Sequence, residues 1–223
     1  FDGSLDYIVS ELTNGGAKGA IANIPDVTEF PYFTTIPYNG LTIDAEQATT
    51  LNSIYNPMGT GINFSEGDNP FAIEDCNEPF CVRLLEEGEL ILLSVPLDSI
   101  KCFGMGSIVP IPNEYILTLA EIDSIQTSID GYNLIIENTA SVYGLALVDY
   151  NSLMSNVKTG IIYNGISINM EFVSGGAFSL DGRHLSPMGN CLLANEFIKA
   201  INVKYNAAIP KADVGDYRGS IFP

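Results

Sequence analysis

The chain has 223 residues, of which 46% are hydrophobic and 16% charged, and its mean hydropathy is +0.20, which excludes a disordered tail. Its 9 Lys and Arg are outnumbered by 27 Asp and Glu, so the formal net charge of −18 disfavours nucleic acid and anionic lipid headgroups as partners. No apolar run approaches the roughly 18 residues of a transmembrane helix.

The four cysteines are Cys76, Cys81, Cys102 and Cys191. None lies in a Cys-x-x-Cys pair, and a single histidine makes a zinc site improbable. Cys76 and Cys81 enclose the turn-like tetrapeptide Asn-Glu-Pro-Phe, so they are either a small disulfide or two free thiols in a loop.

The N-terminal sequence is helix-like. Leu5, Ile8, Val9 and Leu12 follow helical spacing, which predicts an amphipathic helix over residues 4–13 with Ser4 as its N-cap. Because Phe1 begins inside this pattern, we expect a longer precursor with any targeting segment upstream. A buried strand is predicted over residues 19–24, and helix followed by strand is typical of a parallel α/β sheet.

From residue 31 to about residue 112 this rhythm is lost. The stretch holds most of the prolines and few helix signals, and its one clear strand spans Glu89–Val95. The run Glu86–Glu89 is predicted to be a solvated face. We therefore expect an irregular, acidic insertion that is either a functional lid or a structural elaboration.

The α/β rhythm then returns. Thr118 and Glu121 form a capping-box pattern, and the apolar spacing that follows predicts a helix to about Val142. A short buried strand, residues 145–149, ends at Asp149, which we expect to cap a helix or bond a loop.

The last third is predicted to hold a helical turn, a β-like stretch over Ile161–Phe178 and a final helix. Ser186 and Pro187 are the expected N-cap and first residue of that helix. Its predicted inner face consists of Leu193, Phe197, Ala200 and Ile201.

The only histidine, His184, follows Asp181 by three residues in a Gly-containing loop before the final helix. A carboxylate at this spacing can accept a hydrogen bond from one imidazole nitrogen and leave the other nitrogen free as a general base. Asp181 and His184 are therefore the candidate catalytic residues.

The block Asp181–Gly189, Asp-Gly-Arg-His-Leu-Ser-Pro-Met-Gly, resembles the last sequence block of the SGNH, or GDSL-type, serine hydrolases. Residues 16–26 look like the strand that follows the family's third block, and residues 95–107 look like the insertion of its Bacteroidetes members. The resemblance implies an Asp-x-x-His pair that orients and supplies the base for a serine nucleophile.

Three family blocks have no counterpart in the chain: the Gly-Asp-Ser nucleophile block and the two blocks that supply the Gly and Asn of the oxyanion hole. Asp2-Gly3-Ser4 has the wrong order for the first. The resemblance thus implies the C-terminal portion of a three-layer, flavodoxin-like α/β hydrolase domain. Its core comprises residues 1–30 and 113–223, and the insertion, residues 31–112, forms part of the substrate cleft.

The expected function is hydrolysis of a small-molecule ester, with His184 as base, Asp181 as acid partner and the N-terminal part of the same domain supplying the nucleophile. No cofactor or metal is required. The alternative is a non-catalytic binding or scaffold module on a degenerate hydrolase fold. We expect the protein to be secreted, periplasmic or, as a lipoprotein, at the cell surface.

Overall fold

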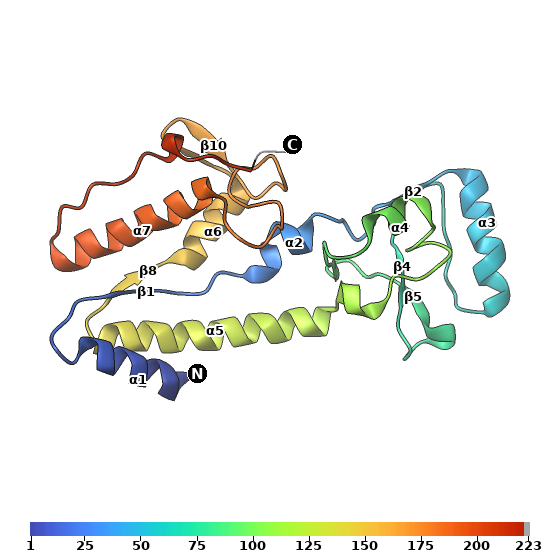
Figure 1. Ribbon diagram of the computed structural model, residues 1–223. Coiled ribbons are helices and arrows are strands. Elements are labelled where there is room, and N and C mark those ends of the chain that lie inside the picture. The colour runs from blue at the N-terminus through green and yellow to red at the C-terminus, as the bar shows by residue number, and fades with distance from the viewer. Residues whose placement is uncertain (221–223) are drawn as a thin grey trace. The chain divides into compact units, whose positions relative to one another are not determined.

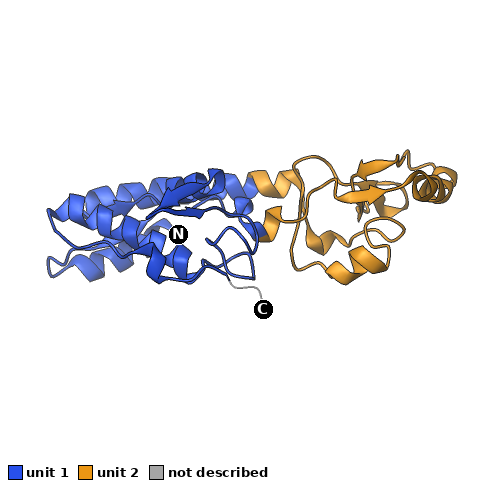
Figure 2. Ribbon diagram, turned by 90° about the horizontal axis from the view of Figure 1, so that it is seen from above, with its two compact units in different colours: residues 1–31, 124–223 blue, residues 32–123 orange. Residues whose placement is uncertain are grey.

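The computed structural model describes residues 1–220 and divides the chain into two compact units. The first comprises Phe1–Pro31 and the residues from Ser124 onward, and the second is Tyr32–Asp123 (Figure 2). The expected insertion, residues 31–112, overlaps the second unit over most of its length. Its role as a wall of a substrate cleft stays a prediction.

The first unit contains a parallel pair of strands, β1 (Ala20–Ala22) and β8 (Ala146–Val148). Ala20 lies opposite Ala146, and the register continues to Ala22 and Val148. The mixed α/β class is thus confirmed. Within residues 1–220 this sheet has only two strands, fewer than the open sheet that the flavodoxin-like prediction implies.

Helices lie on both sides of these strands. Figure 1 shows α7 (Pro187–Tyr205) on one side and α5 (Leu119–Val142), with α1 (Asp2–Thr13) beyond it, on the other. α1, α5 and the residue that precedes β8 share a small apolar cluster of Val9, Ala140 and Leu145. No helix among residues 1–220 is long and apolar enough to span a bilayer.

Two helix starts follow the predicted capping. The Glu121 carboxylate accepts hydrogen bonds from the Thr118 backbone and hydroxyl at 2.9 and 2.7 Å, and α5 ends at Val142 as expected. Ser186 caps α7, since its hydroxyl accepts a 3.0 Å hydrogen bond from the Gly189 backbone. The prediction for Ser4 is wrong, because α1 already begins at Asp2 and Phe1 occupies the N-cap position.

The inner face of α7 differs from the prediction. Its buried residues are Gly189, Cys191, Leu192 and Asn195. The periodicity of apolar residues misses Asn195, whose side-chain amide pairs with both the backbone N–H and the carbonyl of Ala212 at 2.8 and 2.9 Å. A polar side chain can be buried when its hydrogen bonds are satisfied in this way.

The segment after β8 forms α6 (Tyr150–Thr159) and an antiparallel hairpin of β9 (Ile161–Tyr163) and β10 (Ile166–Ile168). Asn164 and Gly165 both have positive φ, 49° and 79°, as a two-residue type I′ turn requires. The predicted β-like stretch is therefore a short hairpin followed by loops.

The second unit is built from short elements arranged as three antiparallel strand pairs, β2–β3, β4–β5 and β6–β7. Its helices and strands are α2 (Pro31–Thr34), β2 (Leu41–Ile43), α3 (Ala45–Tyr55), β3 (Gly67–Asn69), β4 (Ala72–Glu74), β5 (Val82–Leu84), β6 (Leu90–Ile91), α4 (Leu97–Cys102) and β7 (Ile116–Leu117). The predicted strand Glu89–Val95 is thus limited to two residues. α3, which sequence periodicity did not reveal, begins with a capping box between Asp44 and Gln47.

An ion cluster lies in the second unit. The Arg83 guanidinium donates two 2.6 Å hydrogen bonds to the Glu89 carboxylate and one of 2.8 Å to Asp75. The Glu89 side chain is only 3% exposed, so the prediction that Glu86–Glu89 is a solvated face is wrong at Glu89. Hydrogen bonds from Arg83 and then Asn77 lower the pKa of Asp75.

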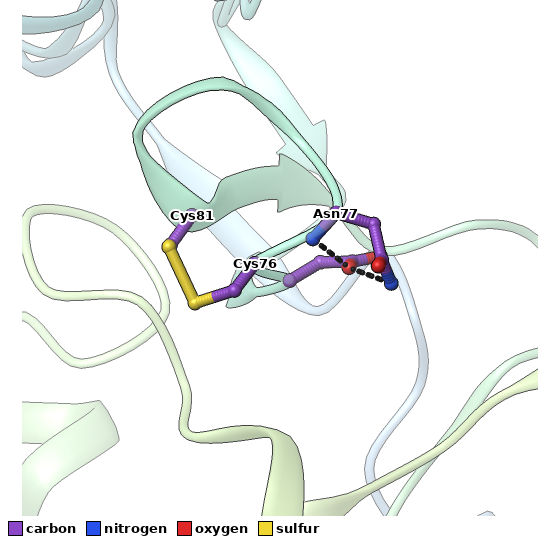
Figure 3. The surroundings of a disulfide bond; sticks show 4 residues. Cys76, Asn77 and Cys81 are labelled. Carbon is purple, nitrogen blue, oxygen red and sulfur yellow. Dashed lines mark hydrogen bonds between the residues drawn. A yellow bond between two sulfur atoms is a disulfide. The ribbon is translucent and has the colours of Figure 1, made fainter.

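The Cys76–Cys81 pair is a disulfide, which decides between the two sequence alternatives (Figure 3). Beside it, the Asn77 backbone and side-chain amide both donate to the Asp75 carboxylate at 3.0 Å. The disulfide loop is therefore joined to the ion cluster through Asp75. Among the described residues Cys102 and Cys191 are free thiols.

Candidate functional site

Asp181 and His184 lie in a short hairpin loop that immediately precedes α7. Phe178 and Leu185 form an isolated antiparallel bridge at its base, and the Ser179 backbone N–H donates to the His184 carbonyl at 2.8 Å. Gly182 occupies the turn with a φ of 68°, in the left-handed region that glycine adopts at no steric cost. This geometry folds the Asp181–His184 segment back on itself.

The two candidate side chains are in direct contact. His184 Nδ1 lies 2.6 Å from Asp181 Oδ2. The His184 side chain is 83% exposed, so Nε2 is open to an approaching group. The spacing-based prediction that these side chains lie within hydrogen-bonding reach agrees with this geometry, while the catalytic role itself stays a prediction.

The Asp181 carboxylate accepts more than the histidine bond. Oδ1 accepts from the Ser179 hydroxyl at 2.6 Å and from the backbone N–H groups of Arg183 and His184 at 2.9 and 3.0 Å. The bond from the His184 ring, then that from Ser179, and then the backbone bonds lower the pKa of Asp181 well below its usual range. The carboxylate is therefore ionised at neutral pH and acts only as an acceptor.

The base of the hairpin is held by the start of α7. Ser186 donates from its backbone to the Ala177 carbonyl at 2.9 Å and from its hydroxyl to the Gly176 carbonyl at 2.6 Å. On the other side, the ring of Phe178 packs against that of Phe30 with a centroid distance of 4.8 Å. The hairpin is thus attached both to α7 and to the segment that follows β1.

A separate polar cluster closes the carboxyl ends of the two parallel strands. Asn23, which follows β1, donates to Asp149 at 2.9 Å and accepts from the Asn151 backbone at 2.8 Å. Asp149 also caps α6 through Ser152, as predicted. Burial opposes ionisation of Asp149, but the hydrogen bonds from Ser152 and Asn23 lower its pKa overall. The cluster is internally satisfied, which favours a structural role for Asp149.

Sequence reasoning missed two of these residues. Ser179 precedes Asp181 by two positions, and a hydroxyl at that distance from a loop carboxylate is the signal that could have revealed their contact. Asn23 directly follows β1, and Asp149 directly follows β8. Their matching positions at the ends of two strands could have indicated the hydrogen bond between them. Within residues 1–220 no group of three or more His, Cys, Asp or Glu side chains is arranged to hold a metal.

Comparisons with models of protein families, with curated proteins and with solved structures find no match to this chain. The likeness to SGNH hydrolases thus depends on the sequence motifs, above all on the block Asp181–Gly189.

Proposed function

We propose that the chain is the acid–base part of an SGNH-type serine ester hydrolase. The supporting observation is the 2.6 Å contact between His184 Nδ1 and Asp181 Oδ2 in an exposed loop. An ionised carboxylate on Nδ1 keeps the proton on that nitrogen and leaves the Nε2 lone pair available. This is the protonation state that a general base requires.

In the proposed reaction Nε2 of His184 takes the proton of a serine hydroxyl as that oxygen attacks the ester carbonyl. The same nitrogen then returns the proton to the leaving alcohol. Water next attacks the acyl-serine, and Nε2 takes a proton from the water and returns it to the serine oxygen as the acid leaves. Asp181 holds the ring and stabilises its transient positive charge. The acid–base step needs no group other than these two side chains.

The serine and the oxyanion donors are proposed to come from polypeptide outside these 223 residues. In favour of this, the parallel sheet has only two strands, and within residues 1–220 neither outer edge pairs with another strand. Unpaired edges have backbone donors and acceptors that further strands can satisfy. An N-terminal part of the same domain would extend the sheet in this way.

The alternative is a binding or scaffold module without catalysis. The observation that favours it is that all four hydrogen bonds accepted by the Asp181 carboxylate come from the loop itself, so they stabilise the hairpin whether or not a serine nucleophile is present. In such a module the Asp181–His184 pair would stabilise the hairpin only.

The two functions can be separated with a chromogenic short-chain ester and a fluorophosphonate probe for reactive serines. We expect the product of the complete reading frame to turn over the ester and to be labelled, and His184→Ala to abolish both. The 223-residue chain alone should be inactive, because losing the nucleophile of such a triad costs on the order of 10⁶-fold in rate. If the complete product neither turns over the ester nor is labelled by the probe, the hydrolase proposal is rejected in favour of the binding module.

We further propose that the protein works outside the cytoplasm, in the periplasm, at the cell surface or in the medium. The Cys76–Cys81 disulfide supports this localisation, because structural disulfides persist in oxidising compartments.

A further inference from the structure

The two oxygens of the Asp181 carboxylate are used very differently. Oδ1 accepts three hydrogen bonds, from the Ser179 hydroxyl and from the backbone N–H groups of Arg183 and His184. Oδ2 accepts the bond from the His184 ring. A carboxylate has about four acceptor positions in all, so these contacts fix which oxygen faces the imidazole.

The two backbone donors alone do not fix the plane of the carboxylate. Both come from consecutive residues, Arg183 and His184, and both bond to Oδ1 alone. The terminal torsion of an aspartate is broad and weakly restricted. The Ser179 hydroxyl reaches Oδ1 from the other strand of the hairpin and restricts rotation about this torsion.

We propose that Ser179 is a positioning residue, which holds the Asp181 carboxylate so that Oδ2 meets Nδ1 of His184 and the imidazole keeps one tautomer. Its importance for catalysis rests on the proposed hydrolase function, but its effect on the imidazole does not. The hydroxyl is well suited to a test, because the backbone of Ser179 makes its own hairpin bonds to His184 and Gly182. Ser179→Ala therefore removes the side-chain contact and retains the backbone contacts.

The test uses the fact that His184 is the only histidine of the chain. In the 223-residue protein labelled with ¹⁵N, the two nitrogens of His184 give the only imidazole signals, and their shifts report the ratio of the two neutral tautomers. The measurement is made at about pH 8.5, where an ordinary histidine is neutral. Backbone spectra of each variant establish that it is folded.

We expect the Nδ1–H tautomer to dominate in the unaltered protein. Ser179→Ala should lower the ratio of Nδ1–H to Nε2–H by about three- to tenfold, the effect of one hydrogen bond of ordinary net strength. Ser179→Thr, which keeps the hydroxyl, should restore the ratio, and Asp181→Asn should lower it further. The matched control, Ser155→Ala at an exposed position of α6, should leave it unchanged.

A folded Ser179→Ala protein with an unchanged ratio would overturn the proposal, and so would a threonine variant that fails to restore a lowered ratio. Because the tautomer ratio needs no nucleophile, this outcome is independent of the esterase assay. If the complete gene product is an esterase, Ser179→Ala should lower kcat by a similar factor and leave KM nearly unchanged. If Ser179→Ala shifts the tautomer ratio but the complete gene product has no esterase activity, the positioning role of Ser179 is supported and the hydrolase function is rejected.

Discussion

Asp181 illustrates what can be predicted at the scale of single residues. The spacing Asp-x-x-His indicates its contact with His184, because a three-residue separation in a Gly-containing turn returns the chain on itself. The contact with Ser179 depends on the hairpin bond between Ser179 and His184. The hydroxyl two positions before Asp181 is a local signal for this contact, whereas the Asp-x-x-His spacing alone does not predict it.

The lowered pKa of Asp181 predicts an acid-dependent loss of stability. A carboxyl whose pKa is lower in the folded than in the unfolded state stabilises the fold above the unfolded value, here an ordinary value of 3.8. That contribution is lost as the pH falls from about 4 through the lower folded value. Denaturant midpoints measured from about pH 5 to pH 2 should therefore fall more steeply for the unaltered protein than for Asp181→Asn. Parallel curves would contradict this.

The ion cluster of Arg83 gives a second prediction at this scale. Arg83→Met removes the partner of the buried Glu89 carboxylate and should destabilise the second unit by about 3–5 kcal/mol. Adding Glu89→Gln should recover part of the loss, because it removes the unpaired charge. Hydrogen exchange of residues 32–123 measures both effects.

The control is Lys158→Met, which breaks an ion pair with Glu29 in which the Lys158 side chain is 54% exposed. Its effect should stay within about 1 kcal/mol. If Lys158→Met destabilised the protein as much as Arg83→Met, the burial of Glu89 would not be the cause of the loss of stability.

At the scale of elements, local signals predict helix ends better than strand lengths. α5 follows from its capping box and apolar period, because both are determined within one helix. β6 has only two residues, since its length is set by its partner β7 and not by the apolar run alone. The inner face of α7 includes Asn195 because the distant Ala212 backbone satisfies its amide.

Two helical glycines predict opposite effects of the same substitution. A Cβ on Gly189, at the start of α7, would collide with the backbone oxygen of Ala177, so Gly189→Ala should cost about 3 kcal/mol and disturb the hairpin base. A Cβ on Gly131, in α5, meets nothing within 4 Å, and Gly131→Ala should stabilise by about 1 kcal/mol. Thermal unfolding of the two variants checks both signs. Equal effects would contradict the packing of α7 on Ala177.

At the scale of the whole molecule, the sequence indicates a break near residue 31 because the helix–strand rhythm ends there, and the compact unit begins at Tyr32. The other boundary is not predicted by the sequence pattern, which ends the insertion at residue 112, whereas the second unit ends at Asp123. α5 begins at Leu119, while the first unit resumes at Ser124, so one continuous helix contributes to both units. Because the apolar residues of α5 keep one helical period, their pattern does not reveal where the chain passes from one unit to the other.

The disulfide predicts the number of reactive thiols in the whole chain. Denatured protein that has not been reduced should show two free thiols, those of Cys102 and Cys191, and reduced protein should show four. Titration with a thiol reagent measures both states. Four thiols before reduction would remove the disulfide as support for an oxidising compartment, and the localisation would then depend on the family resemblance.

The uneven distribution of basic residues has a consequence for proteolysis. Tyr32–Asp123 contains only two of them, Arg83 and Lys101, and the Arg83 guanidinium is enclosed by Glu89 and Asp75. Trypsin, which cleaves after Lys and Arg, should therefore cut the folded second unit at the exposed Lys101 first. Cleavage after Arg83 requires the ion cluster to open, so it should come later, and its rate reports the local opening of the unit already cut at Lys101.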